Sequence, residues 1–355
     1  MGINEESGKE KAGKLVKPTP LKKEKNIVPS SEAYALQTIE QDFPENEVRI
    51  LLLGVDGSGK SSVAQLITGG EVLQTAKKSS KRISAYYPCI RNGRRYVVVD
   101  SPCLFHTRIA PKFVITEVNK LIGLTAPGPH ICIFVVPGVK LSSEEKQAMS
   151  RIQNAFFPGA IDNSIIVLTK SDILNSDGTS IEDFKSNAAP VVQNIMTKCN
   201  NRVVQVDNVS GDKDTQRNQI FDMIQDVLQS NTDTFYTNDV YTLAQVNLRV
   251  HKQKAKEKYM SSDEGIPLLD KIKEVERVRP LNDTTRENET AAASQDMMET
   301  ELERLKEQML QVVCDQVRDG ILQESITPFE LNLRRLLTSG TKAIGKFLSF
   351  MWFVP

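Results

Sequence analysis

Short apolar segments alternate with amphipathic segments through the middle of this 355-residue chain. Five continuous apolar runs have the length of strands: Arg49–Leu53, Tyr96–Val99, Ile131–Val136, Ser164–Leu168 and Val203–Val206. Such runs are typical of parallel strands, which are buried on both faces. Between them apolar residues recur at helical spacing, in 61–67, 112–124, 144–156, 181–198 and 214–228. The alternation predicts an α/β fold with a doubly wound, mostly parallel sheet.

Composition divides the rest of the chain into further segments. Residues 1–47 are rich in lysine and poor in large apolar residues, which predicts a disordered N-terminal arm before an α/β domain over 48–245. We expect 246–296 to be a charged linker or a solvated helix. In 297–340 a short heptad pattern predicts an amphipathic, coiled-coil-like helical extension. The apolar positions of this pattern are Met298, Leu302, Leu305, Met309 and Val312.

The hydrophobic C-terminal tail, 341–355, contains Trp352 and follows basic residues that include Lys342 and Lys346. A helix of its last dozen residues is too short to span a bilayer. It suits a helix that lies at a membrane surface, and equally a terminal helix that docks on protein. Peripheral contact with an intracellular membrane is therefore one of two alternatives for this tail.

Charge and cysteine content restrict the function further. The chain has 45 Lys+Arg and 45 Asp+Glu, so a uniformly basic nucleic-acid-binding protein is excluded, and we expect no nucleic-acid partner. Its five cysteines include no C-x-x-C pair, which argues against a zinc ribbon or a disulfide framework. Since no signal peptide or spanning run is evident either, we expect a cytoplasmic protein.

One motif lies between the first apolar strand and the first helix. It has the form G-x-x-x-x-G-K-[ST] in the context that a phosphate-binding loop (P-loop) requires. In such a loop, backbone N–H groups surround phosphate oxygens, Lys60 reaches the β- and γ-phosphates, and the Ser61 hydroxyl ligates Mg²⁺. The expected phosphate-binding residues are Gly54, Val55, Asp56, Gly57, Ser58, Gly59, Lys60, Ser61 and Ser62.

A second motif, at the end of the strand 164–168, indicates the base. Thr169, Lys170, Ser171 and Asp172 have the form [NT]-K-x-D by which GTPases read guanine. The carboxylate can accept two hydrogen bonds that guanine offers and adenine does not, while the lysine stem packs on the base. We therefore expect GTP and GDP as ligands and these four residues to face the base.

A third motif, Asp100-Ser-Pro-Cys103, ends the strand 96–99. Asp100 is expected to hold Mg²⁺ through water, as the second carboxylate of P-loop proteins does. The GTPase pattern D-x-x-G has glycine where this chain has Cys103, which lacks the freedom of glycine at positive φ. No glutamine follows where Ras-like enzymes position the attacking water. The sequence therefore assigns no catalytic residue and leaves a GTP-driven switch in question.

Further segments carry a family resemblance: Asp100-Ser-Pro-Cys-Leu-Phe, Pro127-Gly-Pro-His130, Glu144-Glu-Lys146, Cys199-Asn-Asn-Arg202 with Asp207-Asn208, and Tyr236-Thr-Asn238. Over about 49–245 the chain resembles the AIG-type G domain of the GIMAP family, immunity-associated P-loop GTPases of the TRAFAC class. The resemblance implies guanine-nucleotide binding, Mg²⁺, slow intrinsic hydrolysis, homo-oligomers that assemble through the nucleotide face, and frequent attachment to intracellular membranes.

The resemblance also implies further site residues. Thr75 falls where the family has a nucleotide-contacting serine or threonine, although several nearby serines compete for that place, and Asn208 closes over the base. The family often has arginine where this chain has Lys120, which cannot form a planar bidentate clamp on a phosphoryl group. For His130 we expect a locally hydrogen-bonded connector rather than a dimer contact.

These features favour a GTP/GDP-dependent assembly scaffold or switch with weak intrinsic hydrolysis. A nucleotide kinase is one alternative, because Asp56-Gly-Ser-Gly-Lys-Ser61 also resembles the phosphate loop of thymidylate-type kinases. Against it, the chain shows no arginine-rich lid, and the guanine motif would go unexplained. The other alternative is a pseudo-GTPase, a binding module without turnover in which Cys103 has frozen the switch.

Overall fold

The computed structural model describes residues 43–70, 83–104, 109–156, 159–207, 212–232, 234–278 and 289–328. Several expectations lie outside these residues: the predicted disordered arm up to residue 42, the hydrophobic tail 341–355, and the site residues Thr75 and Asn208.

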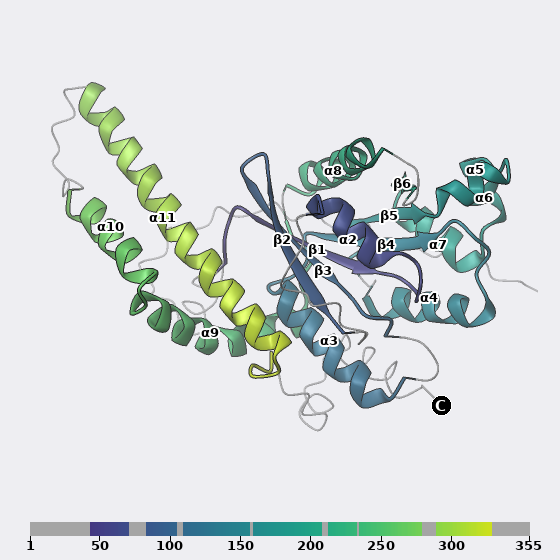
Figure 1. Ribbon diagram of the computed structural model, residues 1–355, viewed down its shortest axis with the longest axis horizontal. Coiled ribbons are helices and arrows are strands. Elements are labelled where there is room, and N and C mark those ends of the chain that lie inside the picture. The colour runs from purple at the N-terminus through teal and green to yellow at the C-terminus, as the bar shows by residue number, and fades with distance from the viewer. Residues whose placement is uncertain are drawn as a thin grey trace, which may run out of the picture. The chain divides into compact units, whose positions relative to one another are not determined.

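A six-stranded sheet forms the centre of the described chain, in the order β2-β3-β1-β4-β5-β6 (Figure 1). The strands are β1 (Glu47–Leu53), β2 (Ala85–Arg91), β3 (Arg94–Asp100), β4 (Ile131–Pro137), β5 (Ser164–Thr169) and β6 (Val203–Gln205). All pair in parallel except β2, which is antiparallel to β3. Every residue of β1, β4 and β5 is buried, which explains their continuous apolar runs. The predicted doubly wound, mostly parallel α/β fold is confirmed.

Strand β2 is missing from the prediction, because its side chains are half-buried or exposed and form no continuous apolar run. It joins β3 through Asn92 and Gly93, whose φ angles are 51° and 75°. Two central residues at positive φ suit a tight hairpin turn, and Asn-Gly is the strongest short signal for one. The signal for this edge strand was therefore present in the turn and absent from the strand.

Helices cover both faces of the sheet: α2 (Lys60–Thr68), α3 (Pro111–Thr125), α4 (Ser143–Phe156), α5 (Ser171–Ser176), α6 (Ile181–Asn187), α7 (Pro190–Lys198) and α8 (Lys213–Ser230). Alternate residues of β1 enter two separate cores, with Leu51 packing beside residues of α3, α4 and α7, and Leu52 beside residues of α2 and α8. The single helix expected over 181–198 is broken, because Pro190 starts α7 as its first residue.

The C-terminal extension consists of α9 (Asp239–Met260), α10 (Gly265–Val278) and α11 (Glu289–Leu322), and α11 packs against both others (Figure 1). A small core joins them: Tyr259, Leu268, Ile272, Leu302 and Leu305. The apolar residues of 246–278 are few, but helical spacing buries Leu248, Tyr259, Leu268 and Ile272. The expectation of a charged linker or a solvated helix therefore missed this packing. No described helix is both long and apolar enough to cross a membrane.

A buried ion network fastens α11 to the sheet. The Arg318 guanidinium on α11 donates to both carboxylate oxygens of Glu47 on β1, at 2.5 and 3.0 Å. Arg49 and Arg95 lie 3.4 Å from the same carboxylate. Burial alone would raise the pKa of Glu47, but the hydrogen bonds and charge of Arg318, with the charges of Arg49 and Arg95, lower it to about 2. Glu47 is therefore ionised in the folded chain.

Candidate functional site

The predicted phosphate loop occupies residues 54–59, between β1 and α2. Gly57 and Gly59 have φ angles of 67° and 93°, in the region that glycine adopts without strain. At Gly54 a Cβ atom would lie 2.5 Å from the carbonyl oxygen of Val135 on β4. Close backbone packing therefore requires glycine at 54, and loop conformation favours it at 57 and 59.

Lys60, the first residue of α2, is buried against this loop. Its Nζ donates to the carbonyl oxygens of Gly54 and Val55, at 3.0 and 2.9 Å. Burial lowers the pKa of Lys60, and the negative charge of Asp100 opposes that effect. The structure thus holds a cationic side chain on the loop that was predicted to surround phosphates.

The two predicted metal ligands meet beside the loop. The Ser61 hydroxyl donates to Oδ2 of Asp100, the last residue of β3, at 2.6 Å. Burial raises the pKa of Asp100, while the hydrogen bond from Ser61 and the charge of Lys60 oppose the rise. Among the described residues, Asp100 Oδ1 is one of the few buried side-chain oxygens without a hydrogen-bond partner, and Ser58 Oγ is another. Hydroxyl and carboxylate oxygens are ligands that Mg²⁺ prefers, so this pair fits a Mg²⁺ site.

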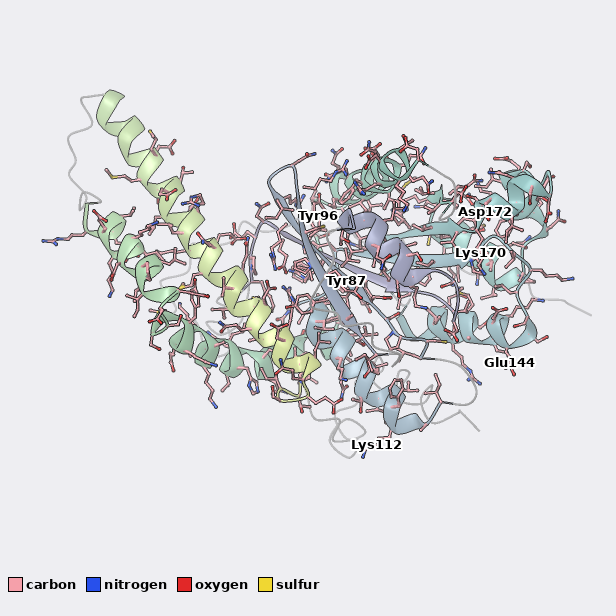
Figure 2. All side chains as sticks on the ribbon, in the orientation of Figure 1. Tyr87, Tyr96, Lys112, Glu144, Lys170 and Asp172 are labelled. Carbon is pink, nitrogen blue, oxygen red and sulfur yellow. The ribbon has the colours of Figure 1, made fainter. Side chains whose placement is uncertain are left out.

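The predicted base-reading residues run from Thr169, the last residue of β5, to Asp172 in the first turn of α5, and Figure 2 labels Lys170 and Asp172 there. Lys170 and Asp172 are half-buried. We expected Thr169 to face the base as well, but its hydroxyl is fully buried and donates to the carbonyl oxygen of Ser58 at 2.7 Å. Thr169 therefore joins the base motif to the phosphate loop, which no sequence pattern indicated.

Backbone hydrogen bonds hold the base motif at the strand ends. The Gly138 N–H, just after β4, donates to the carbonyl oxygen of Thr169 at 2.7 Å. The Ser171 N–H donates to that of Val206, just after β6, at 3.3 Å. The carboxyl ends of β3, β4, β5 and β6 thus lie along one edge of the sheet, where ligands of open α/β sheets bind.

Cys103, which replaces the glycine of D-x-x-G, lies buried after β3. It is not among the described residues with positive φ. The chain here adopts a conformation that cysteine tolerates, so the substitution causes no backbone strain.

Two further residues weighed in the sequence make local contacts. Nδ1 of the buried His130 accepts the Arg49 N–H at 3.0 Å, and burial, with the charge of Arg49, holds the pKa of His130 well below its usual range. This is the local connector role expected of it. The Lys120 ammonium contacts carboxylate oxygens of Glu117 and Glu324 at 2.8 and 2.9 Å.

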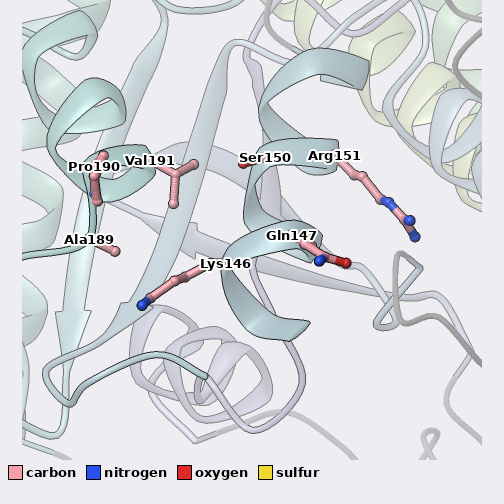
Figure 3. A pocket seen from close by; sticks show the side chains of 7 residues that line it. All are labelled: Lys146, Gln147, Ser150, Arg151, Ala189, Pro190 and Val191. Atoms are coloured by element: carbon pink, nitrogen blue, oxygen red, sulfur yellow. The ribbon is translucent and has the colours of Figure 1, made fainter. Parts of the chain in front are cut away.

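Pockets lined by described residues also lie beyond the predicted site. One of about 390 Å³ lies between α4 and α7 and is lined by Lys146, Gln147, Ser150, Arg151, Ala189, Pro190 and Val191 (Figure 3). Another of about 600 Å³ shares Lys146, Ala189 and Pro190 with it and reaches Ile173 and Leu174 on α5. Neither includes a predicted site residue, and no sequence motif indicated them.

A family model described as the AIG1 family matches residues 48–256. Immune-associated nucleotide-binding protein 8 of Arabidopsis thaliana is 27% identical over 222 residues, which cover 60% of this chain and 63% of that protein. Immune-associated nucleotide-binding protein 7 of the same organism is 24% identical over 225 residues, covering 60% and 72%. The chain thus spans less than two thirds of the first of these relatives.

Solved structures with a similar arrangement include Toc33 from Arabidopsis thaliana in complex with GDP and Mg²⁺, at 16% identity and a TM-score of 0.43. That match covers 59% of this chain and 97% of the other. This TM-score is too low to support membership in a family, which follows from the family model. Because that model spans more than half of its residues, the chain belongs to the AIG1 family.

Proposed function

We propose that this protein binds GTP and GDP together with Mg²⁺ at the edge of the sheet, within a domain over 48–245. The observation that carries the proposal is the Ser61–Asp100 hydrogen bond, with an unpartnered buried carboxylate oxygen beside the loop that Lys60 covers. In this proposal residues 54–62 hold the phosphates. Thr75 and Asn208, outside the described residues, are further contacts on the strength of the resemblance alone.

For the metal, Ser61 Oγ would be a direct ligand and Asp100 would act through water. The bound Mg²⁺ would neutralise negative charge on the phosphates. Burial raises the pKa of Asp100 more than the hydrogen bond from Ser61 and the charge of Lys60 lower it, and a cation beside the carboxylate would favour its ionised form. The relatives named immune-associated nucleotide-binding proteins agree with this proposal.

Guanine would be selected by the Asp172 carboxylate, and Asp172→Asn tests this. An amide can accept only one of the two hydrogen bonds and offers a donor to xanthine, so GTP affinity should fall by at least about tenfold while xanthosine triphosphate affinity rises. The matched control is Asp177→Asn at the exposed end of α5, which should change neither affinity. GTP affinity unchanged in the Asp172 variant would refute the base-reading role.

We propose weak intrinsic hydrolysis, because the sequence assigns no catalytic residue and Cys103 replaces the glycine that senses the γ-phosphate. Lys120 offers no substitute for an arginine finger, since Glu117 and Glu324 engage its ammonium. The buried Cys103 equally favours a second candidate, a pseudo-GTPase. Single-turnover hydrolysis and the ratio of GTP to GDP affinity distinguish the weak GTPase from the pseudo-GTPase. Equal affinities for GTP and GDP with no turnover would favour the pseudo-GTPase, because a ligand with equal affinity for both states cannot drive a switch.

On the resemblance, we further propose a GTP/GDP-dependent assembly scaffold that forms homo-oligomers through the nucleotide face. We place it in the cytoplasm with peripheral membrane contact through the C-terminal tail. Light scattering of the GDP form and of a form with a non-hydrolysable GTP analogue tests the assembly: the GTP form should be larger, and equal masses would contradict a nucleotide-dependent scaffold.

A further inference from the structure

The phosphate loop contains one side chain whose charge opposes that of an attractive site for phosphate. Asp56 lies among the glycines of residues 54–59, where backbone N–H groups are expected to surround phosphate oxygens. Asp56 is exposed, whereas the neighbouring Val55 and Ser58 are buried. A carboxylate and a phosphate are both anions, so this side chain repels the ligand that the rest of the loop attracts.

The conformation of the loop places Asp56 at its outer corner. The Ser58 N–H donates to the Val55 carbonyl oxygen at 3.3 Å, which makes Asp56 and Gly57 the central residues of a tight turn. A Cβ atom added to Gly57 would meet no atom within 4 Å, so this corner borders open space. The Asp56 side chain therefore projects from the loop and does not pack into the sheet.

This corner lies beside the lysine that is expected to reach the β- and γ-phosphates. The Lys60 ammonium is held by the carbonyl oxygens of Gly54 and Val55, and Val55 immediately precedes Asp56. Burial lowers the pKa of Lys60, and the negative charges of Asp100 and Asp56 are among those that oppose this effect. A carboxylate that acts on this ammonium also acts on the phosphates that the ammonium would bind.

The two acids near Lys60 differ in what compensates them. Asp100 is buried, accepts the hydroxyl of Ser61 and would lie beside the proposed Mg²⁺. Asp56 lies on the exposed side of the loop, away from that pair. GTP carries more negative charge than GDP because of its γ-phosphate. Repulsion by Asp56 therefore weakens the binding of GTP more than the binding of GDP.

Resting on the proposed function, we propose that Asp56 is a specificity-determining residue that shifts the preference of the site from GTP towards GDP. Its carboxylate repels the γ-phosphate, while the backbone of the same loop still binds the phosphates that GTP and GDP share. The loop thus favours the GDP form through its own sequence, independently of the substitution at Cys103.

Competition of GTP and GDP against fluorescent GDP in Mg²⁺ tests the proposal with Asp56→Asn, which keeps the size of the side chain and removes its charge. The variant should bind GTP roughly tenfold more tightly and GDP less than about threefold more tightly, for a like charge acting at an effective dielectric constant of about 20. Added salt should change the GTP-to-GDP affinity ratio more in the wild type than in the variant, because it screens an exposed charge.

Two further variants separate charge from structure. Asp56→Glu keeps the charge and should keep the wild-type ratio of GTP to GDP affinity. The matched control is Asp177→Asn at the exposed end of α5, which removes the same charge outside the phosphate loop and should also leave the ratio unchanged.

The possible outcomes distinguish this inference from the function on which it rests. If the wild type binds GDP and Asp56→Asn leaves the affinity ratio unchanged, the inference alone is overturned. A fall in GTP affinity in that variant would also overturn it, and would assign the carboxylate to binding a cation instead. No binding of the probe by the wild type would overturn the proposed function and the inference together.

Discussion

Thr169→Val tests the connection between the base motif and the phosphate loop. The substitution keeps the shape of the side chain and removes one hydroxyl, which is fully buried and donates to the Ser58 carbonyl oxygen at 2.7 Å. Losing a hydrogen bond and leaving a buried acceptor without this donor costs about 1–2 kcal/mol of folding stability. If about 1 kcal/mol of this free energy keeps the loop ordered, the bound phosphate must supply it in the variant. Nucleotide affinity then falls roughly fivefold.

The matched control is Thr125→Val on α3. Thr125 is equally buried, and its hydroxyl contacts the Leu121 carbonyl oxygen at 2.7 Å and the Tyr241 hydroxyl at 2.9 Å, away from the loop. Urea unfolding should show similar destabilisation of both variants, while titration with fluorescent GDP should show weaker binding only for Thr169→Val. Equal affinities of the two variants for GDP would refute the idea that Thr169 positions the loop.

Two further predictions concern the loop and the ion network. Gly54→Ala would place a Cβ 2.5 Å from the Val135 carbonyl oxygen, so nucleotide affinity should fall by at least about tenfold. Gly178→Ala meets no nearby atom but strains the backbone at a φ of 64°, so it should lower the stability and leave nucleotide binding unchanged in the same titration. Because the pKa of Glu47 is about 2 in the folded chain against 4.5 unfolded, its contribution of about 3 kcal/mol is complete above pH 4.5 and lost as pH falls towards 2. Arg318→Met should flatten this part of the pH dependence in urea unfolding, and an unchanged slope would contradict it.

Much of the sheet was predictable, because strands buried on both faces must be apolar throughout, as β1, β4 and β5 are. The loop over 54–59 was equally readable, since its glycines and Lys60 follow a strand and precede a helix. These features depend on neighbouring residues, so a local pattern records them.

Contacts between distant residues left no comparable pattern. Arg318 and Glu47 are 271 positions apart, and either alone reads as an ordinary surface charge. Thr169 and Ser58 meet across 111 positions, so nothing local shows that the threonine hydroxyl is directed at the loop. The packing of α9 and α10 depends on helical spacing of sparse apolar residues, which a reading by average composition overlooks.

The most direct test of the central claim is the competition of unlabelled nucleotides against fluorescent GDP on purified, nucleotide-free protein in Mg²⁺. We predict that GTP and GDP displace the probe and that ATP does not. Chelation of Mg²⁺ should weaken triphosphate binding, because Ser61 and Asp100 would then have no cation to hold. Displacement by ATP as readily as by GTP, or no binding of the probe, would contradict the account.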